Sequence, residues 1–185
     1  LVGSEMCIRD RYFDLSIRRI EIKKPKRDLK PVIKLQDEVN KTLLHDEYYY
    51  PTDERTIQEC LDGDYILLGV YNKDKLIAAS FAFEGGLFFS KPITDWMEIP
   101  GNKIMCHEFV VVDMEYRGNG IQKRFMDATI REARQMGYDT IWCCAHPNNT
   151  PSVCSIESTG YKFADQFVVD GWPRNVYYRS TSIQR

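Results

Sequence analysis

Hydrophobic side chains recur along most of this chain with the periods of strands and helices. Alternating or short apolar runs predict strands, and apolar residues three and four apart predict helices. The predicted order is strand 12–22, helix 28–44, helix 52–61, strands 65–71 and 76–84, strand 103–112, helix 121–136, strand 140–145, helix 150–158 and strands 161–169 and 175–179. This order predicts a single α/β domain built on one mixed sheet with helices.

Three segments refine this picture. The strand over 103–112 is the most apolar and ends in Phe109-Val110-Val111-Val112, so we expect it at the centre of the sheet. Asp28 is expected to cap the first long helix, and Pro31 is tolerated in its first turns. Residues 85–102 carry Phe, Trp and Pro without a regular period. They are a covering loop, the interpretation we favour, or a wall of a binding pocket.

Composition narrows the class of protein. The 185 residues are 43% hydrophobic and 28% charged, with a net charge of −2, which suits one soluble domain and gives no basic face for nucleic acid. No apolar run approaches the roughly 20 residues of a membrane helix. The cysteines after residue 11 are odd in number and include an adjacent pair, a poor disulfide framework that favours the cytoplasm; they are Cys60, Cys106, Cys143, Cys144 and Cys154.

The first eleven residues are expected to be foreign to the fold. Back-translation of Leu1 to Asp10 in one frame gives the arm and mosaic end of a transposase-based sequencing adapter, and Arg11 is then a junction codon. We therefore expect 1–11 to be an adapter-derived artefact, which is excluded from fold reasoning, and 12–185 to form the domain. The alternative is a genuine N-terminal extension.

The chemically informative stretch follows the central strand. An apolar strand runs into a turn with Gly118 and Gly120 and then directly into a helix. Glycines let the backbone approach a ligand, and the helix start offers unpaired N–H groups and a positive dipole end. This combination suits phosphates, although a plain strand-to-helix turn needs no ligand. The pattern is neither GxGxxG nor a P-loop.

This stretch resembles the motif of the GNAT superfamily of acyl-CoA-dependent N-acyltransferases, Arg/Gln-x-x-Gly-x-Gly/Ala after an apolar strand. Arg117 and Gly120 match the motif, whereas Gln122 departs from its final small residue. The resemblance implies a GNAT-like fold, with a mixed twisted sheet, helices on both faces and splayed central strands at the acyl-CoA site. It implies that acetyl-CoA is held by Val110, Val112, Arg117, Gly118, Asn119, Gly120, Ile121 and Gln122.

A second match lies at the spacing of the same family. The pattern Asn-x-x-Ala/Ser followed by Gly-aromatic fits Asn149 to Ser152 and Gly160-Tyr161. In the family this Asn contacts the pantetheine arm or braces its loop, and Asn148 competes for the role. Asn149 is equally suited to cap the following helix, and the two roles can coexist.

The resemblance implies an oxyanion donor, and the apolar strand itself offers a candidate base. Val110 is predicted to donate its backbone N–H to the oxyanion, and Glu108 is predicted to be the general base, because a partly buried carboxylate has a raised pKa. Alternation places Cys106, Glu108 and Val110 on one face and His107 on the other. Two alternatives stay open: Glu108 forms a structural pair with a Lys or Arg, or His107 is the base.

The family's usual acid, a Tyr, is replaced by Ile156. The thiolate then leaves unassisted or takes a proton from water or a nearby Tyr. We expect an N-acetyltransferase that acts on an unidentified amine, with no nucleic acid or membrane partner. The alternative is a non-catalytic acyl-CoA-binding module. Cys143, Cys144 and His146 are not expected to bind metal, because adjacent strand residues point to opposite faces.

Overall fold

The computed structural model describes residues 16–19, 29–84, 87–88, 91–92 and 103–182. Residues 1–11, the predicted cap Asp28 and most of loop 85–102 lie outside this part of the chain. The elements in chain order are β1 (Ser16–Arg19), α1 (Lys30–Asn40), a 3-10 turn (Asp46–Tyr48), α2 (Glu54–Cys60), β2 (Tyr65–Asn72), β3 (Lys75–Glu84), β4 (Leu87–Phe88), β5 (Lys91–Pro92), β6 (Ile104–Val112), a 3-10 turn (Met114–Tyr116), α3 (Ile121–Gln135), β7 (Thr140–Ala145), α4 (Thr150–Ser158), β8 (Lys162–Val169) and β9 (Trp172–Ser180).

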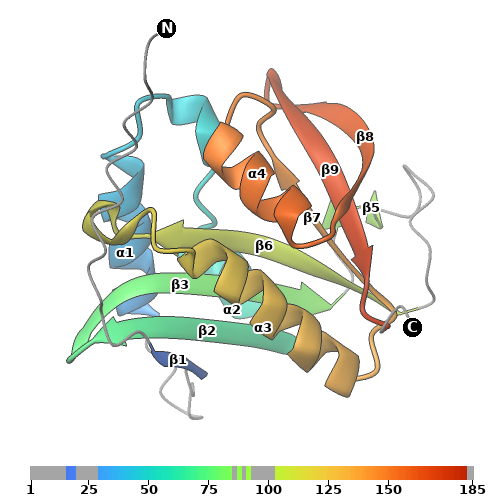
Figure 1. Cartoon of the computed structure of the whole chain (residues 1–185), viewed down its shortest axis with the longest axis horizontal. Coiled ribbons are helices and arrows are strands. Elements are labelled where there is room, and N and C mark those ends of the chain that lie inside the picture. The colour runs from blue at the N-terminus through green and yellow to red at the C-terminus, as the bar shows by residue number, and fades with distance from the viewer. Residues whose placement is uncertain (1–15, 20–28, 85–86, 89–90, 93–102, 183–185) are drawn as a thin grey trace, which may run out of the picture.

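The main sheet is mixed, as predicted, and β6 lies at its centre (Figure 1). The strand order is β1-β2-β3-β6-β7-β9-β8. All neighbours are antiparallel except β6 and β7, which are parallel and joined through α3. A parallel pair needs such a crossover because the chain must return to the same end of the sheet.

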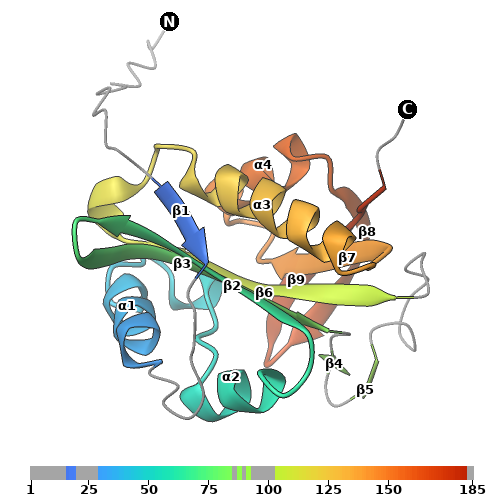
Figure 2. The ribbon, with the colours of Figure 1, turned by 90° about the horizontal axis from the view of Figure 1, so that it is seen from below.

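Helices cover both faces of the sheet, as predicted (Figure 2). Helices α1 and α2 pack on one face over a core that includes Leu35, Ile57 and Phe81. Helices α3 and α4 pack on the other face over a second core that includes Phe125 and Ile156. No helix in the described ranges is long and apolar enough to cross a membrane.

Helix α1 is shorter than its hydrophobic pattern predicts. It begins near Pro31, which the first turn tolerates, but it ends at Asn40 instead of continuing to residue 44. The hydroxyl of Thr42 donates to the carbonyl of Val39 at 2.7 Å and helps to close the helix there. Leu44 is 94% exposed, so its apolar side chain does not continue the buried face of the helix, as the sequence pattern had suggested.

The last two strands form a hairpin that is longer than predicted. Asp170 and Gly171 occupy the turn with φ values of 50° and 84°, which is the conformation of a tight two-residue hairpin turn. The Asp-Gly pair was therefore a usable sequence signal for this turn. Strand β9 begins directly after it, at Trp172, and brings residues 172–174 into the sheet.

Candidate active site

A pocket of 660 Å³ opens where β6 and β7 separate. The two strands pair only from Ile104 with Thr140 to Cys106 with Trp142. Beyond Cys106 they diverge, which confirms the predicted splay. Backbone groups of β6 that face the gap therefore lack a strand partner on that side, and a ligand that enters the gap can reach them.

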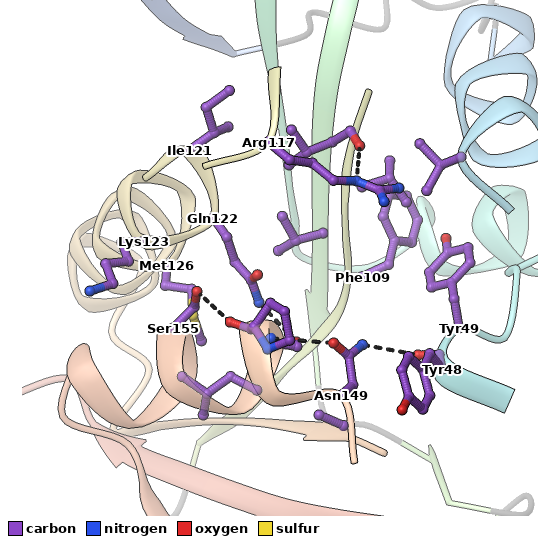
Figure 3. A pocket seen from close by; sticks show the side chains of 18 of the residues that line it. Tyr48, Tyr49, Phe109, Arg117, Ile121, Gln122, Lys123, Met126, Asn149 and Ser155 are labelled. Carbon is purple, nitrogen blue, oxygen red and sulfur yellow. Dashed lines mark hydrogen bonds between the residues drawn. The ribbon is translucent and has the colours of Figure 1, made fainter. Parts of the chain in front are cut away.

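Side chains from segments distant in sequence surround this pocket (Figure 3). Arg117 and Gln122 come from the loop and helix after β6. Asn149 comes from the start of α4, and Tyr48 comes from the 3-10 turn between α1 and α2. Elements on both faces of the sheet therefore contribute residues to the pocket.

The loop after β6 is held in shape by its own polar groups. The carboxylate of Asp113 accepts a hydrogen bond from the N–H of Glu115 at 3.1 Å and from Lys75 Nζ at 2.7 Å. Gly118 and Gly120 have φ values of 82° and 68°, in the left-handed region that favours glycine. The glycines are therefore required by the backbone itself, with or without a ligand.

The start of α3 presents free backbone donors to the pocket. The first helical hydrogen bond runs from Arg124 N to Gly120 O, so the N–H groups of Ile121, Gln122 and Lys123 precede the helical ladder. All three residues line the pocket. Unpaired N–H groups at the positive end of a 15-residue helix form a site suited to an anion.

Among the predicted loop residues, Asn119 has a different position. It does not line the pocket, and its side-chain amide donates to the carbonyl of Tyr116 at 2.9 Å. Gln122, the departure from the family motif, donates from Nε2 to Ser152 Oγ at 3.0 Å and so joins the starts of α3 and α4. A direct contact of either side chain with a cofactor stays a prediction.

Arg117 is fixed at the pocket wall. Its Nε donates to the carbonyl of Val112 at 3.2 Å, and its Nη2 donates to Thr42 Oγ1 at 3.2 Å. Burial lowers the pKa of Arg117, yet a guanidinium stays charged at neutral pH. Thr42 lies 75 residues earlier in the chain, and no local sequence pattern could have identified this contact.

Asn149 caps α4, which confirms one of its two predicted roles. Its Oδ1 accepts from Ser152 N at 3.4 Å, and its Nδ2 donates to the carbonyl of Tyr48 at 3.4 Å. It also lines the pocket, so a contact with the pantetheine arm stays a prediction. Asn148, the competitor, instead donates its backbone N–H to Nδ1 of His146 at 3.2 Å.

A β-bulge at Glu108 corrects the predicted faces of β6. Phe81 pairs with Phe109 and Ala82 pairs with His107, so Glu108 is the extra residue. Glu108 therefore stays with Cys106, but Val110 lies on the opposite face, against the core under α3. The prediction that Val110 shares a face with Glu108 was wrong, because simple alternation ignores the bulge.

Glu108 lies in the pocket with neutral partners. Its Oε1 accepts from Thr52 Oγ1 at 3.0 Å, and its Oε2 accepts from Cys106 Sγ at 3.6 Å. No Lys or Arg of the described residues lies within ion-pair distance of it, so the alternative of a structural ion pair has no support there. Solvent reaches the carboxylate through the pocket. The surrounding protein nevertheless desolvates the carboxylate, and this raises the pKa of Glu108 above its ordinary value of 4.5. The hydrogen bonds from Thr52 and Cys106 lower the pKa by less than desolvation raises it.

His107 is a weaker candidate for the base. It is 4% exposed, and its Nε2 lies 2.7 Å from Ser80 Oγ. Burial lowers the pKa of His107 to about 4, so the ring is neutral at neutral pH but a poor proton acceptor.

The position of the family's general acid also lies in the pocket. Ile156, at the position of the family's Tyr, is 2% exposed and lines the pocket without a protic group. Tyr48 lines the same pocket and carries a hydroxyl.

Cys143 is buried and Cys144 is exposed. No group of three His, Cys, Asp or Glu side chains suited to a metal occurs in the described part of the chain.

The open mixed sheet, its splayed central pair and the glycine turn that opens a helix together form the fold that the resemblance to the GNAT superfamily implies. The profile of the Acetyltransferase (GNAT) family matches residues 33–161, and the chain belongs to this family. No curated protein matches the chain.

Solved structures share the fold at low sequence identity. The ribosomal-protein-S18-alanine N-acetyltransferase from Escherichia coli has a TM-score of 0.64 and 17% identity, over 92% of this chain and 96% of that chain. The NatC complex bound to Gag peptide and CoA has a TM-score of 0.67 and 11% identity, over 90% and 98%. The yncA protein from Salmonella typhimurium, with acetyl-CoA, has a TM-score of 0.61 and 16% identity, over 91% and 94%.

Proposed function

We propose that this protein is an N-acetyltransferase that transfers the acetyl group of acetyl-CoA to a primary amine. The observation that carries the proposal is the desolvated carboxylate of Glu108, placed in the strand splay without a cationic partner among the described residues. Structures that contain CoA or acetyl-CoA share the fold and support acetyl-CoA as the donor. A purely binding module has no need for such a carboxylate, which costs stability.

The pocket residues fit the donor. The N–H groups at the start of α3 and the cation of Arg117 suit the pyrophosphate. The open edge of β6 suits the amide groups of the pantetheine arm. Acetyl-CoA supplies the acetyl group as a reactive thioester.

Each protein group then has a distinct task. Glu108, as its carboxylate, takes a proton from the ammonium before attack or from the amine nitrogen as it bonds to the thioester carbon, directly or through a water. The backbone N–H of Val110 is the proposed donor to the thioester oxygen, where negative charge develops as nitrogen bonds to carbon. The carbon–sulfur bond breaks, and the sulfur leaves as a thiolate or takes a proton from water or from a nearby hydroxyl such as that of Tyr48.

The direct test is turnover on a panel of primary amines. The protein is incubated with acetyl-CoA and each amine, and free thiol is measured over time together with the acetylated product. Amine-dependent thiol release supports the proposal. CoA binding by calorimetry without turnover on any amine would instead identify a non-catalytic acyl-CoA-binding module.

A further inference from the structure

A buried cation, Arg174, lies close to the pocket-lining Cys144, although it does not itself line the pocket, and it has no carboxylate partner among the described residues. Arg174, near the start of β9, is 7% exposed. Its Nη1 donates to the carbonyl of the adjacent Pro173 at 3.1 Å, and no Asp or Glu in the described ranges lies within ion-pair distance of its guanidinium. Arginine is seldom buried unpaired, because removing its charge from water is costly. A ligand that supplies an anion would offset this cost.

The sheet places Arg174 on the same face as the proposed base. Alternation along β9 puts Arg174 and Val176 on one face, and Val176 pairs with Cys144 of β7. Val176 also packs in one cluster with Cys106, whose thiol donates to Glu108. Glu108, Cys144 and Arg174 therefore follow one another across β6, β7 and β9.

Electrostatics support this placement. Desolvation is the largest cause of the rise in the pKa of Cys144 to about 12; the charge of Glu108 adds to this rise, and the charge of Arg174 opposes it. Cys144 is solvent-accessible through the pocket although protein surrounds it, so both charges act close to the space that a ligand can enter.

Three aromatic rings lie next to one another near this part of the sheet; of these, Tyr48 lines the pocket and His146 is buried. The rings of Tyr48 and His146 lie 5.2 Å apart, and those of His146 and Trp172 lie 6.4 Å apart. Burial, with a further contribution from the charge of Arg174, lowers the pKa of His146, so at neutral pH its ring is not a second cation. Trp172 is 48% exposed, which leaves apolar surface available beside Arg174.

We propose that Arg174 binds a carboxylate of the acceptor, and that the acceptor is a small amine that carries a carboxylate. This inference rests on the proposed N-acetyltransferase function. A planar guanidinium offers paired N–H donors that match a carboxylate. The amine lies toward Glu108, and any flat apolar group lies against the accessible rings of Tyr48 and Trp172. Strand β7 lies between β6, which carries Glu108, and β9, which carries Arg174, so the two backbones are at least about 10 Å apart. The two side chains and a molecule of amino-acid size can fill this span.

The test uses amino acids, each paired with the amine that lacks its carboxylate, such as phenylalanine and phenethylamine. The wild-type kcat/KM should favour the carboxylate-bearing member by about 10–100-fold, the range for a hydrogen bond to a charged group. Arg174→Gln should remove this preference mainly by raising the KM of the amino acid, while leaving CoA affinity unchanged. Arg131→Gln, on the exposed side of α3, is the matched control.

Product binding separates this inference from the proposed function. Calorimetry with the CoA-loaded protein compares N-acetylphenylalanine with N-acetylphenethylamine, and it needs no turnover. Arg174-dependent binding of the acid, with no acetylation of any amine, would support the carboxylate site and refute the transferase. The carboxylate site would be refuted, and the transferase function retained, if turnover and binding were equal within each pair. A marked preference for peptide N-termini over free amino acids would have the same meaning. Arg174→Lys, with a melting temperature near that of wild type, guards against a folding effect.

Discussion

Replacement of Glu108 by glutamine tests the chemistry with a small change in shape. Gln keeps an oxygen that can accept from Thr52 Oγ1, which lies 3.0 Å from Glu108 Oε1. It also keeps a polar group beside Cys106 Sγ, 3.6 Å from Oε2. What it loses is the ability to take a proton as a carboxylate. We expect kcat/KM to fall by about 10²–10⁴-fold, the usual contribution of general base catalysis.

The fall in rate corresponds to about 2.7–5.4 kcal/mol of transition-state stabilisation. Stability should respond differently. Because desolvation raises the pKa of Glu108, the stability from its protonated form is present below the unfolded value and is lost as pH rises through the folded pKa. Above its folded pKa the wild type therefore carries the cost of a desolvated carboxylate, and the Gln variant does not. Its melting temperature should equal or exceed that of wild type.

The assay is initial thiol release against pH with an established acceptor. The wild-type kcat/KM should rise on a limb above the ordinary Glu pKa of 4.5, and Glu108→Gln should lose or shift this limb. If the limb reports only the acceptor amine, it should remain in the variant at lower rate. A variant with near-wild-type activity and the same pH profile would show that Glu108 is structural. His107 or a water chain would then become the leading candidate for the base.

Further predictions concern the donor site and the domain boundary. Gly120→Val should weaken CoA binding at least about tenfold by calorimetry, whereas Gly137→Val, with a similar positive φ far from the pocket and a comparable strain of about 1–2 kcal/mol, should not. Arg117→Ala should weaken CoA binding less than Gly120→Val if main-chain amides provide much of the contact; a larger loss would contradict this. Asn149→Ala should remove a cap and about 1 kcal/mol of stability, and an unchanged melting temperature would refute the capping role. Deletion of residues 1–11 should leave the melting temperature unchanged, and a fall of several degrees would show that they belong to the fold.

Periodicity predicted most of the described elements because they pack one apolar face on a common core. Helix α3 illustrates this, since Ile121, Phe125, Met126 and Ile130 all lie in the core that the sequence pattern indicated. Errors arose where the chain leaves the core. Leu44 is apolar yet exposed, so hydrophobicity alone could not mark the end of α1.

The site was only partly predictable for a related reason. Local motifs identified the glycine turn and Asn149, because their roles depend on neighbouring backbone. The contacts of Arg117 with Thr42 and of Glu108 with Thr52 join residues 75 and 56 positions apart, so they exist only after folding. The bulge at Glu108 also depends on the register with β3 and leaves no periodic trace in β6.

The bulge links the architecture to the proposed chemistry. A regular strand would place the side chains of Glu108 and Val110 on the same face of the sheet. The extra residue leaves Glu108 with Thr52 on the α1 and α2 side, while Val110 packs toward α3. In the proposed mechanism, the amine then approaches from the α1 and α2 face, while the donor arm occupies the gap between β6 and β7. The bulged position is thus the one that places the side chains of the proposed base and of Val110 on opposite faces.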